Sequence, residues 1–86
     1  MTTDITAIEK NRTEELRVAL KEYKGHDYVD VRTYVEPYAD EGQGRIPTKR
    51  GITLRVRKLP ELIVALKEAE QQARTAGLLT TKEEHA

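Results

Sequence analysis

The chain has 86 residues and a formal net charge of zero, and 35% of its residues are charged. This length fits one small domain whose core supplies little stability alone, and without cysteine no disulfide can add to it, so we expect a second copy to bury more surface. No apolar run reaches the ~20 residues of a membrane span. We therefore expect a soluble, cytoplasmic protein that makes no membrane contact.

The first two segments of the chain differ in how clearly they predict structure. Residues 1–12 are polar and predict a flexible lead before the domain. Residues 14–24 are ambiguous, because Leu16, Val18 and Leu20 alternate with other residues as in a strand, whereas the segment is also rich in good helix formers. On these residues alone, propensity slightly favours a helix.

The clearest strand covers residues 28–35. Val29, Val31 and Val35 fall on one face of it, with tyrosines and charged residues on the other. The glycine-containing segment 24–27 predicts a turn before this strand. Residues 36–44 predict a loop after it, because they contain proline and glycine.

A basic segment at residues 45–58 contains six basic residues and no acidic one. Pro47 and Gly51 predict a turn within it, and the alternation at residues 52–56 predicts a strand, so the segment forms one or two further strands. A local excess of positive charge in a neutral chain attracts polyanions. A solvated basic strand at a sheet edge explains the same pattern equally well.

Residues 59–76 predict a helix. Pro60 suits its first turn, and Gly77 ends it. Its apolar residues recur at steps of three and four, so they either cover a sheet or join the helix of a second copy. The predicted dimer seam consists of Leu59, Leu62, Leu66, Ala69 and Ala73. Strands first and a helix last predict an α+β domain at residues 13–78, followed by a flexible tail at residues 79–86.

Residues suited to catalysis are scarce. The chain has no serine and no cysteine, which removes the common hydroxyl and thiol nucleophiles. His26 and His85 lack the spacing of metal ligands. Asp40 and Glu41 do not follow the pattern of a calcium loop, and the nearby glycines lack a phosphate-binding fingerprint. We therefore expect no enzymatic activity, no cofactor and no metal.

Nucleic-acid binding is better supported. Proteins that hold single strands combine cations for phosphates with aromatic rings for bases. All four aromatic residues are tyrosines. Tyr23 lies between two lysines, and Tyr34 follows Arg32 by two residues on the same strand face. Packing across strands is the alternative role for Tyr28 and Tyr34.

Three motifs occur in order between about Leu16 and Ala76. Residues 18–25 are a strand with a Lys-Gly turn, residues 29–34 contain Asp-x-Arg-x-Tyr, and residues 47–54 read Pro-Thr-Lys-Arg-Gly-Ile-Thr-Leu. Together they resemble the C-terminal domain of the transcriptional coactivator family called positive cofactor four, in a compact bacterial or phage-type form.

The resemblance implies a four-stranded antiparallel sheet followed by one C-terminal helix, in a dimer formed through the helices. It also implies that the sheet binds single-stranded DNA with little sequence preference, and that residues 14–24 form a strand. Tyr23 falls where the family has a base-stacking aromatic. Val35 replaces a second stacking aromatic and His26 replaces a lysine, which predicts weaker binding unless Tyr34 or Tyr38 substitutes.

The predicted function is that of a homodimeric single-stranded DNA-binding protein in transcription, replication or repair. It would be nucleoid-associated in the cytoplasm, with the transcription machinery as a further partner. An RNA-binding protein and a protein-interaction module that uses the basic sheet edge and the helix seam are the alternatives. The predicted DNA-binding residues are Lys21, Tyr23, Lys24, Arg32, Tyr34, Arg45, Lys49 and Arg50.

Overall fold

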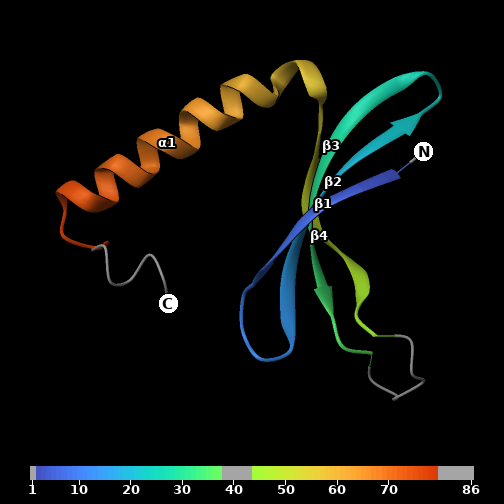
Figure 1. Ribbon diagram of the computed structural model, residues 1–86, viewed down its shortest axis with the longest axis horizontal. Coiled ribbons are helices and arrows are strands. Elements are labelled where there is room, and N and C mark those ends of the chain that lie inside the picture. Colours follow the sequence, from blue (N-terminus) through green and yellow to red (C-terminus); the bar gives the residue numbers. More distant parts are fainter. Residues whose placement is uncertain (1, 38–43, 80–86) are drawn as a thin grey trace. The chain divides into compact units, whose positions relative to one another are not determined.

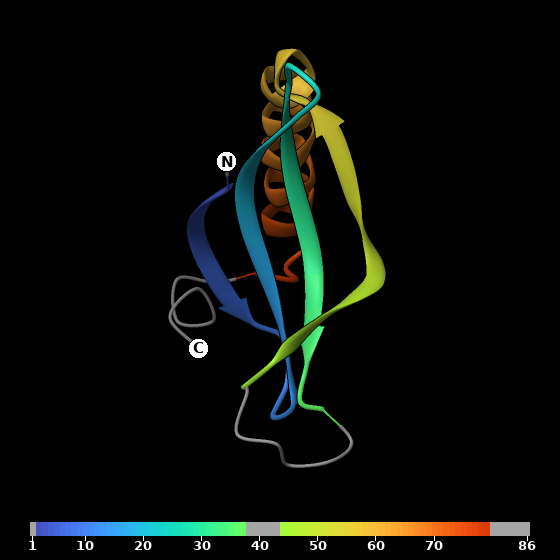
Figure 2. The ribbon, with the colours of Figure 1, turned by 90° about the vertical axis from the view of Figure 1, so that its right-hand side faces the viewer.

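The computed structural model describes residues 2–37 and 44–79. Their elements follow the chain as strands and then helices (Figure 1): β1 (Thr2–Glu9), β2 (Glu14–Tyr23), β3 (His26–Val35), β4 (Ile46–Arg55), the 3₁₀ helix η1 (Val56–Lys58) and α1 (Leu59–Thr75). The strands form one antiparallel sheet in the order β1-β2-β3-β4, which Figure 2 shows side by side. A four-stranded antiparallel sheet followed by one C-terminal helix is therefore confirmed.

The last strand ends at Arg55; the compact unit that contains the sheet extends to Val56, and a second compact unit starts at Arg57. Among the described residues, no helix is long and apolar enough to span a membrane. Tyr38, Asp40, Glu41 and the predicted tail beyond Leu79 lie outside the described residues.

The start of the chain differs from the prediction. The polar composition of residues 1–12 predicts a flexible lead, whereas Thr2–Glu9 form β1 and pair with β2. Its large apolar residues Ile5 and Ile8 are each 55% exposed. The backbone pairing to β2, which composition does not reveal, is what places β1 in the sheet. The basic segment forms one strand, β4, which is within the expected one or two strands. The turn expected at Pro47 and Gly51 is absent, because both residues lie within β4.

The ambiguous segment forms strand β2, as the resemblance implies, and not the helix that its composition slightly favours. Its apolar residues Leu16, Val18 and Leu20 lie directly opposite residues of β3. Cross-strand apolar pairs stabilise a sheet, so tertiary pairing outweighs the local helix propensity.

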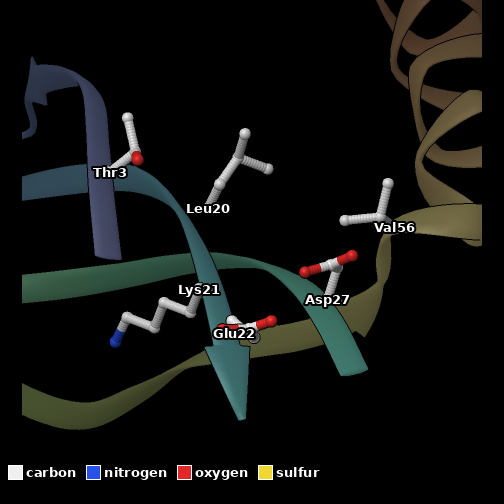
Figure 3. Close-up of a pocket in the computed structure, with 6 residues that line it drawn as sticks. All are labelled: Thr3, Leu20, Lys21, Glu22, Asp27 and Val56. Carbon is white, nitrogen blue, oxygen red and sulfur yellow. The ribbon is translucent and has the colours of Figure 1, made fainter. Parts of the chain in front are cut away.

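The two faces of the sheet differ in chemistry, because residues opposite each other in an antiparallel pair share a face. What we call the apolar face carries Leu16, Val18, Leu20, Val29, Val31, Ile52 and Leu54. What we call the polar face carries Arg17, Lys21, Tyr23, Tyr28, Asp30, Arg32, Tyr34, Thr53 and Arg55. Figure 3 shows this alternation at Leu20 and Lys21, which point to opposite sides of β2. The two faces predicted for residues 28–35 are confirmed.

The β2–β3 connection is a two-residue turn at Lys24 and Gly25. Both residues have positive φ, 51° and 78°, and the strands pair up to Tyr23 and His26. Two consecutive residues of positive φ are the mark of a type I′ hairpin, whose twist matches that of the strands. The predicted turn is thus confirmed, and it places the side chain of Lys24 at the tip of the hairpin.

Helix α1 begins and ends where the sequence predicts, within a residue. Pro60 lies in its first turn, where a missing N–H has no cost. At the other end, Gly77 has a φ of 77°, its N–H donates to Arg74 O at 3.0 Å, and the N–H of Leu78 donates to Ala73 O at 2.8 Å. These two bonds form a Schellman motif, which satisfies the last carbonyls of the helix.

Gly51 allows β3 and β4 to approach closely. A Cβ atom at this position would lie 2.5 Å from the carbonyl oxygen of Val31 and 2.8 Å from the Cα of Arg32. Both neighbours are backbone atoms, so a side chain here would have to push the strands apart. Next to this point the register between β3 and β4 shifts, between Arg32 and Tyr34, and Figure 2 shows β4 bending.

We expect Gly51→Ala to lower the free energy of unfolding by about 1–3 kcal/mol, the usual cost of overpacking. Urea denaturation followed by circular dichroism measures this change. Lys49→Ala is the matched control, because Lys49 is exposed on the same strand, and it should change stability by less than about 0.5 kcal/mol. Equal stability of Gly51→Ala and the parent chain would contradict the close approach.

Candidate nucleic-acid interface

A buried carboxylate, that of Asp30, lies at the centre of the polar face. Asp30 is 3% exposed. Its oxygens accept hydrogen bonds from Arg32 Nε at 3.2 Å, Arg32 Nη2 at 2.9 Å and Thr53 Oγ1 at 2.7 Å. Lys21 Nζ lies 3.4 Å away as a further ion-pair partner. The carboxylate therefore gathers groups from β2, β3 and β4 around one point.

Besides pairing with Asp30, Arg32 of β3 forms a hydrogen bond to β4. Its Nη1 donates to the carbonyl of Thr48 at 2.9 Å, and the hydroxyl of Thr48 donates to the carbonyl of Thr33 at 2.8 Å. Both bonds fall where the β3–β4 register is shifted and the regular ladder is interrupted. Most N–H groups of Arg32 therefore already donate hydrogen bonds within the protein. Few of them remain for DNA, although Arg32 is one of the predicted DNA-binding residues.

The ionic partners of Asp30 change its protonation. Burial alone would raise the pKa of Asp30, but hydrogen bonds from Arg32 and Thr53 and the positive charges of Lys21 and Arg32 lower that pKa below its ordinary value. A lowered folded-state pKa stabilises the fold at pH values above the ordinary carboxyl pKa. That stabilisation is lost as the pH falls through the folded-state pKa.

We expect Asp30→Asn to lower the free energy of unfolding at pH 7 by about 1.5–3 kcal/mol, the usual worth of hydrogen bonds to a charged group. The difference from the parent chain should shrink as the pH falls below about 4, because the parent carboxylate then becomes protonated as well. Urea denaturation at a series of pH values measures both effects.

Asp27→Asn serves as the control for Asp30→Asn, because Asp27 is an exposed carboxylate on the same strand. It should change stability at pH 7 by less than about 0.5 kcal/mol. A difference between Asp30→Asn and the parent chain that stays constant down to pH 2 would contradict an ionised Asp30.

A second ionic cluster lies at the start of β2. Glu15 pairs with Arg17 at 2.5 Å and with Arg45 at 2.7 Å. Hydrogen bonds from Arg17 and Arg45 lower the pKa of Glu15, and the bond from Arg17 has the larger effect. Arg45 also donates to the carbonyl of Arg12 at 2.9 Å.

Glu14 pairs with Arg50, and hydrogen bonds from Asn11 and then Arg50 lower the pKa of this carboxyl. Like Arg32, the predicted DNA-binding arginines Arg45 and Arg50 are therefore held by carboxylates, so all three are paired. A phosphate would have to compete with these carboxylates for them.

The described tyrosines of the sheet each lie next to a cation. The guanidinium of Arg17 is 4.1 Å from the ring centroid of Tyr34, Lys24 Nζ is 5.3 Å from that of Tyr23, and the guanidinium of Arg55 is 5.6 Å from that of Tyr28. Cations within about 6 Å of a ring face are attracted to it. Tyr23 is 62% exposed and so offers the most open ring.

The structure brings half of the predicted DNA-binding residues onto one surface. Lys21, Tyr23, Arg32 and Tyr34 lie on the polar face, and Lys24 lies at the hairpin tip beside them. The other three are Arg45, before β4, and Lys49 and Arg50, in the irregular part of that strand. Lys49 is exposed and has no ion pair with any residue in the described ranges.

Three polar-face residues that the sequence reasoning did not place in the site are Arg17, Tyr28 and Arg55. The signal for them is the strand register, because Arg55 lies directly opposite Tyr28 and Arg17 directly opposite Arg32. Val35, in contrast, lies opposite Glu14 and Ile46, so it belongs with the apolar face. An aromatic residue at position 35 would therefore not lie on the same face as Tyr23.

A pocket of about 340 Å³ opens on the opposite side of the sheet from the tyrosines. Figure 3 shows Leu20 and Val56 beside it, and the carboxylates Glu22 and Asp27 come from neighbouring strands. Thr3 and Lys21 also line the pocket, but the side chain of Lys21 points to the other side of β2. The remaining apolar and acidic side chains do not suit a polyanion. Within residues 2–37 and 44–79, no group of three or more acidic, histidine or cysteine side chains could hold a metal ion.

The predicted dimer seam lies along α1. Leu66 is 60% exposed, and its neighbour Ile63 is 44% exposed. Leu59, Leu62 and Ala73 are each half-buried. An exposed apolar stripe on a helix is a surface that a second protein segment can cover.

Comparisons with known proteins agree with this architecture. A family model described as Transcriptional Coactivator p15 (PC4) matches residues 10–65. A PC4 homologue from Burkholderia pseudomallei, in its tetragonal crystal form, is 30% identical with a TM-score of 0.70, covering 81% of this chain and 98% of that chain. Its orthorhombic form gives 32% identity and a TM-score of 0.69, covering 79% and 88%.

A phage protein shares the fold at lower identity. It is the bacteriophage T5 homologue of the eukaryotic transcription coactivator PC4, implicated in recombination-dependent DNA replication. Its identity is 19% and its TM-score is 0.63, and the match covers 99% of this chain and 97% of that chain. No curated protein matches the chain.

Proposed function

The chain belongs to the PC4 family of transcriptional coactivators, and we propose that it is a homodimer that binds single-stranded DNA with little sequence preference. Proteins of this family are non-enzymatic DNA-binding proteins. The observation that carries the proposal is the polar face of the sheet, on which tyrosine rings and cations alternate. This combination suits bases that are free to stack and a backbone of phosphates.

The cations of the site divide into two groups by their present partners. Lys49 has no ion pair among the described residues, and Lys24 lies only against the ring of Tyr23, so both can meet a phosphate directly. Arg45 and Arg50 are held by Glu15 and Glu14, and they would exchange a carboxylate for a phosphate. Lys21, which pairs with Asp30 at 3.4 Å, lies beside Tyr23 on the same strand.

The bases would meet the site at Tyr23. Its ring is the most exposed of the described tyrosines, at the hairpin end of the polar face. Stacking on an aromatic ring is possible for every base, because each has a π face. A site built on stacking and phosphate contacts therefore has little sequence preference.

A second copy of the chain would cover apolar surface that one copy leaves open. The seam of α1 exposes Leu66 and Ile63, and the apolar face of the sheet exposes Leu20 at 39% and Ile52 at 47%. Such surface is unfavourable in water and is usually buried in an interface. The proposed location is the cytoplasm, in association with the nucleoid, and the proposed process is transcription, replication or repair.

We expect Lys49→Ala combined with Arg50→Ala to weaken single-strand binding and to flatten its salt dependence. The slope of log K against log salt should become shallower by about 0.7 for each phosphate contact that is lost. Fluorescence anisotropy of a labelled mixed-sequence single strand at several salt concentrations measures this, with duplex and RNA as competitors.

Lys67→Ala combined with Arg74→Ala removes the same charge from helix α1 and should leave the slope of the parent chain. An unchanged slope in the Lys49 and Arg50 variant would remove these residues from the site. Effective competition by RNA would instead assign the site to single strands of either kind, and failure of the parent chain to bind any strand at low salt would contradict the proposed function.

We expect Leu66→Asp to convert the dimer to monomers, because it places a charge in the proposed seam between two helices. Sedimentation velocity measures the mass, and circular dichroism checks that the monomer keeps its fold. Glu68→Asp is a control on the same helix and should remain dimeric. A folded Leu66→Asp dimer would show that the seam lies elsewhere.

A further inference from the structure

Tyr28 occupies a position on the polar face that no sequence motif singles out. The register places Lys21 of β2 on one side of it and Arg55 of β4 on the other, so the three residues form a row across the sheet. The guanidinium of Arg55 lies 5.6 Å from the ring centroid of Tyr28. An aromatic ring between two cations can bind a base while both of its flanks meet phosphates.

Tyr28 is also next to the most exposed tyrosine. Tyr23 lies opposite His26, two residues before Tyr28 on β3, which makes Tyr23 and Tyr28 diagonal neighbours on one face. Diagonal neighbours of this kind are roughly 7–8 Å apart and are within reach of each other's aromatic rings. Two consecutive bases of a strand that crosses the hairpin end of the sheet could therefore meet the two rings in turn.

The other described tyrosine of the face suits this role less well. The guanidinium of Arg17 lies 4.1 Å from the ring centroid of Tyr34, and Glu15 holds this arginine at 2.5 Å. To stack on Tyr34, a base would have to displace Arg17, which Glu15 holds in place by an ion pair. Arg55, in contrast, is exposed, lies farther from its ring, and has no ion pair with the residues that the structure describes.

We propose that Tyr28, flanked by Lys21 and Arg55, is a second stacking platform that binds the base next to the one on Tyr23. This inference rests on the proposed single-strand function and adds a subsite to it. On binding, Arg55 moves from the ring of Tyr28 to a backbone phosphate, and the base takes its place on the ring. The row then compensates for the aliphatic residue at position 35.

The test is fluorescence anisotropy of a labelled oligothymidylate with the full chain and three variants. Tyr28→Leu should bind about 5- to 150-fold more weakly, the effect of losing one stacked base. Tyr28→Phe keeps the ring and should stay within about twofold of the parent chain. Arg55→Gln should weaken binding and make the salt slope shallower by about 0.7, one lost phosphate contact.

The outcomes separate this subsite from the function on which it rests. Unchanged affinity of a folded Tyr28→Leu, with the parent chain binding tightly, would overturn the subsite alone. Equal losses in Tyr28→Phe and Tyr28→Leu would overturn stacking as its basis. If Tyr28→Leu does not fold, Arg55→Gln decides, and an unchanged affinity and slope would overturn the subsite. A parent chain that binds no single strand would overturn the proposed function as well.

Discussion

The polar face of the sheet depends on one buried charge, the carboxylate of Asp30. A buried carboxylate without partners would be strongly destabilising, and this one is satisfied by Arg32, Thr53 and Lys21. The same contacts fix the shape of the surface, because Arg32 also holds the carbonyl of Thr48 where the ladder between β3 and β4 is interrupted. Lys49 and Arg50 come directly after Thr48 in the chain. Their backbone is therefore positioned by the contacts that begin at Asp30.

The two faces of the sheet suit different kinds of partner. One face is aliphatic and remains partly open to water, which suits contact with protein. The other combines tyrosines, cations and a few carboxylates, and its arginines Arg17 and Arg32 pair with Glu15 and Asp30. This balance explains how a chain of zero net charge can carry several cations on one surface. In the proposed complex, phosphates would compete with these carboxylates, which favours contacts that form and break easily.

Local signals in the sequence were sufficient for several elements. Alternation predicted β3 and its two faces, and Pro60 and Gly77 predicted the limits of α1. The segment of β2 needed the family resemblance, because its composition favours helix and only pairing with β3 decides. β1 was missed because its place depends on backbone pairing and not on burial. The ion pairs of Arg45 and Arg50 join residues 30 and 36 positions apart, and the row of Lys21, Tyr28 and Arg55 depends on register, so neither could be read from neighbouring residues.

We propose that a single strand lies on the polar face, and nuclear magnetic resonance of the aromatic rings tests this placement most directly. The chain has four tyrosines and no phenylalanine or tryptophan, so Tyr→Phe variants can assign every tyrosine ring resonance. On titration with unlabelled oligothymidylate, the ring resonances of Tyr23 should move upfield as a base stacks on it. Binding that leaves the tyrosine resonances in place and shifts the methyl resonances of Leu20 and Ile52 would put the strand on the apolar face and contradict the account.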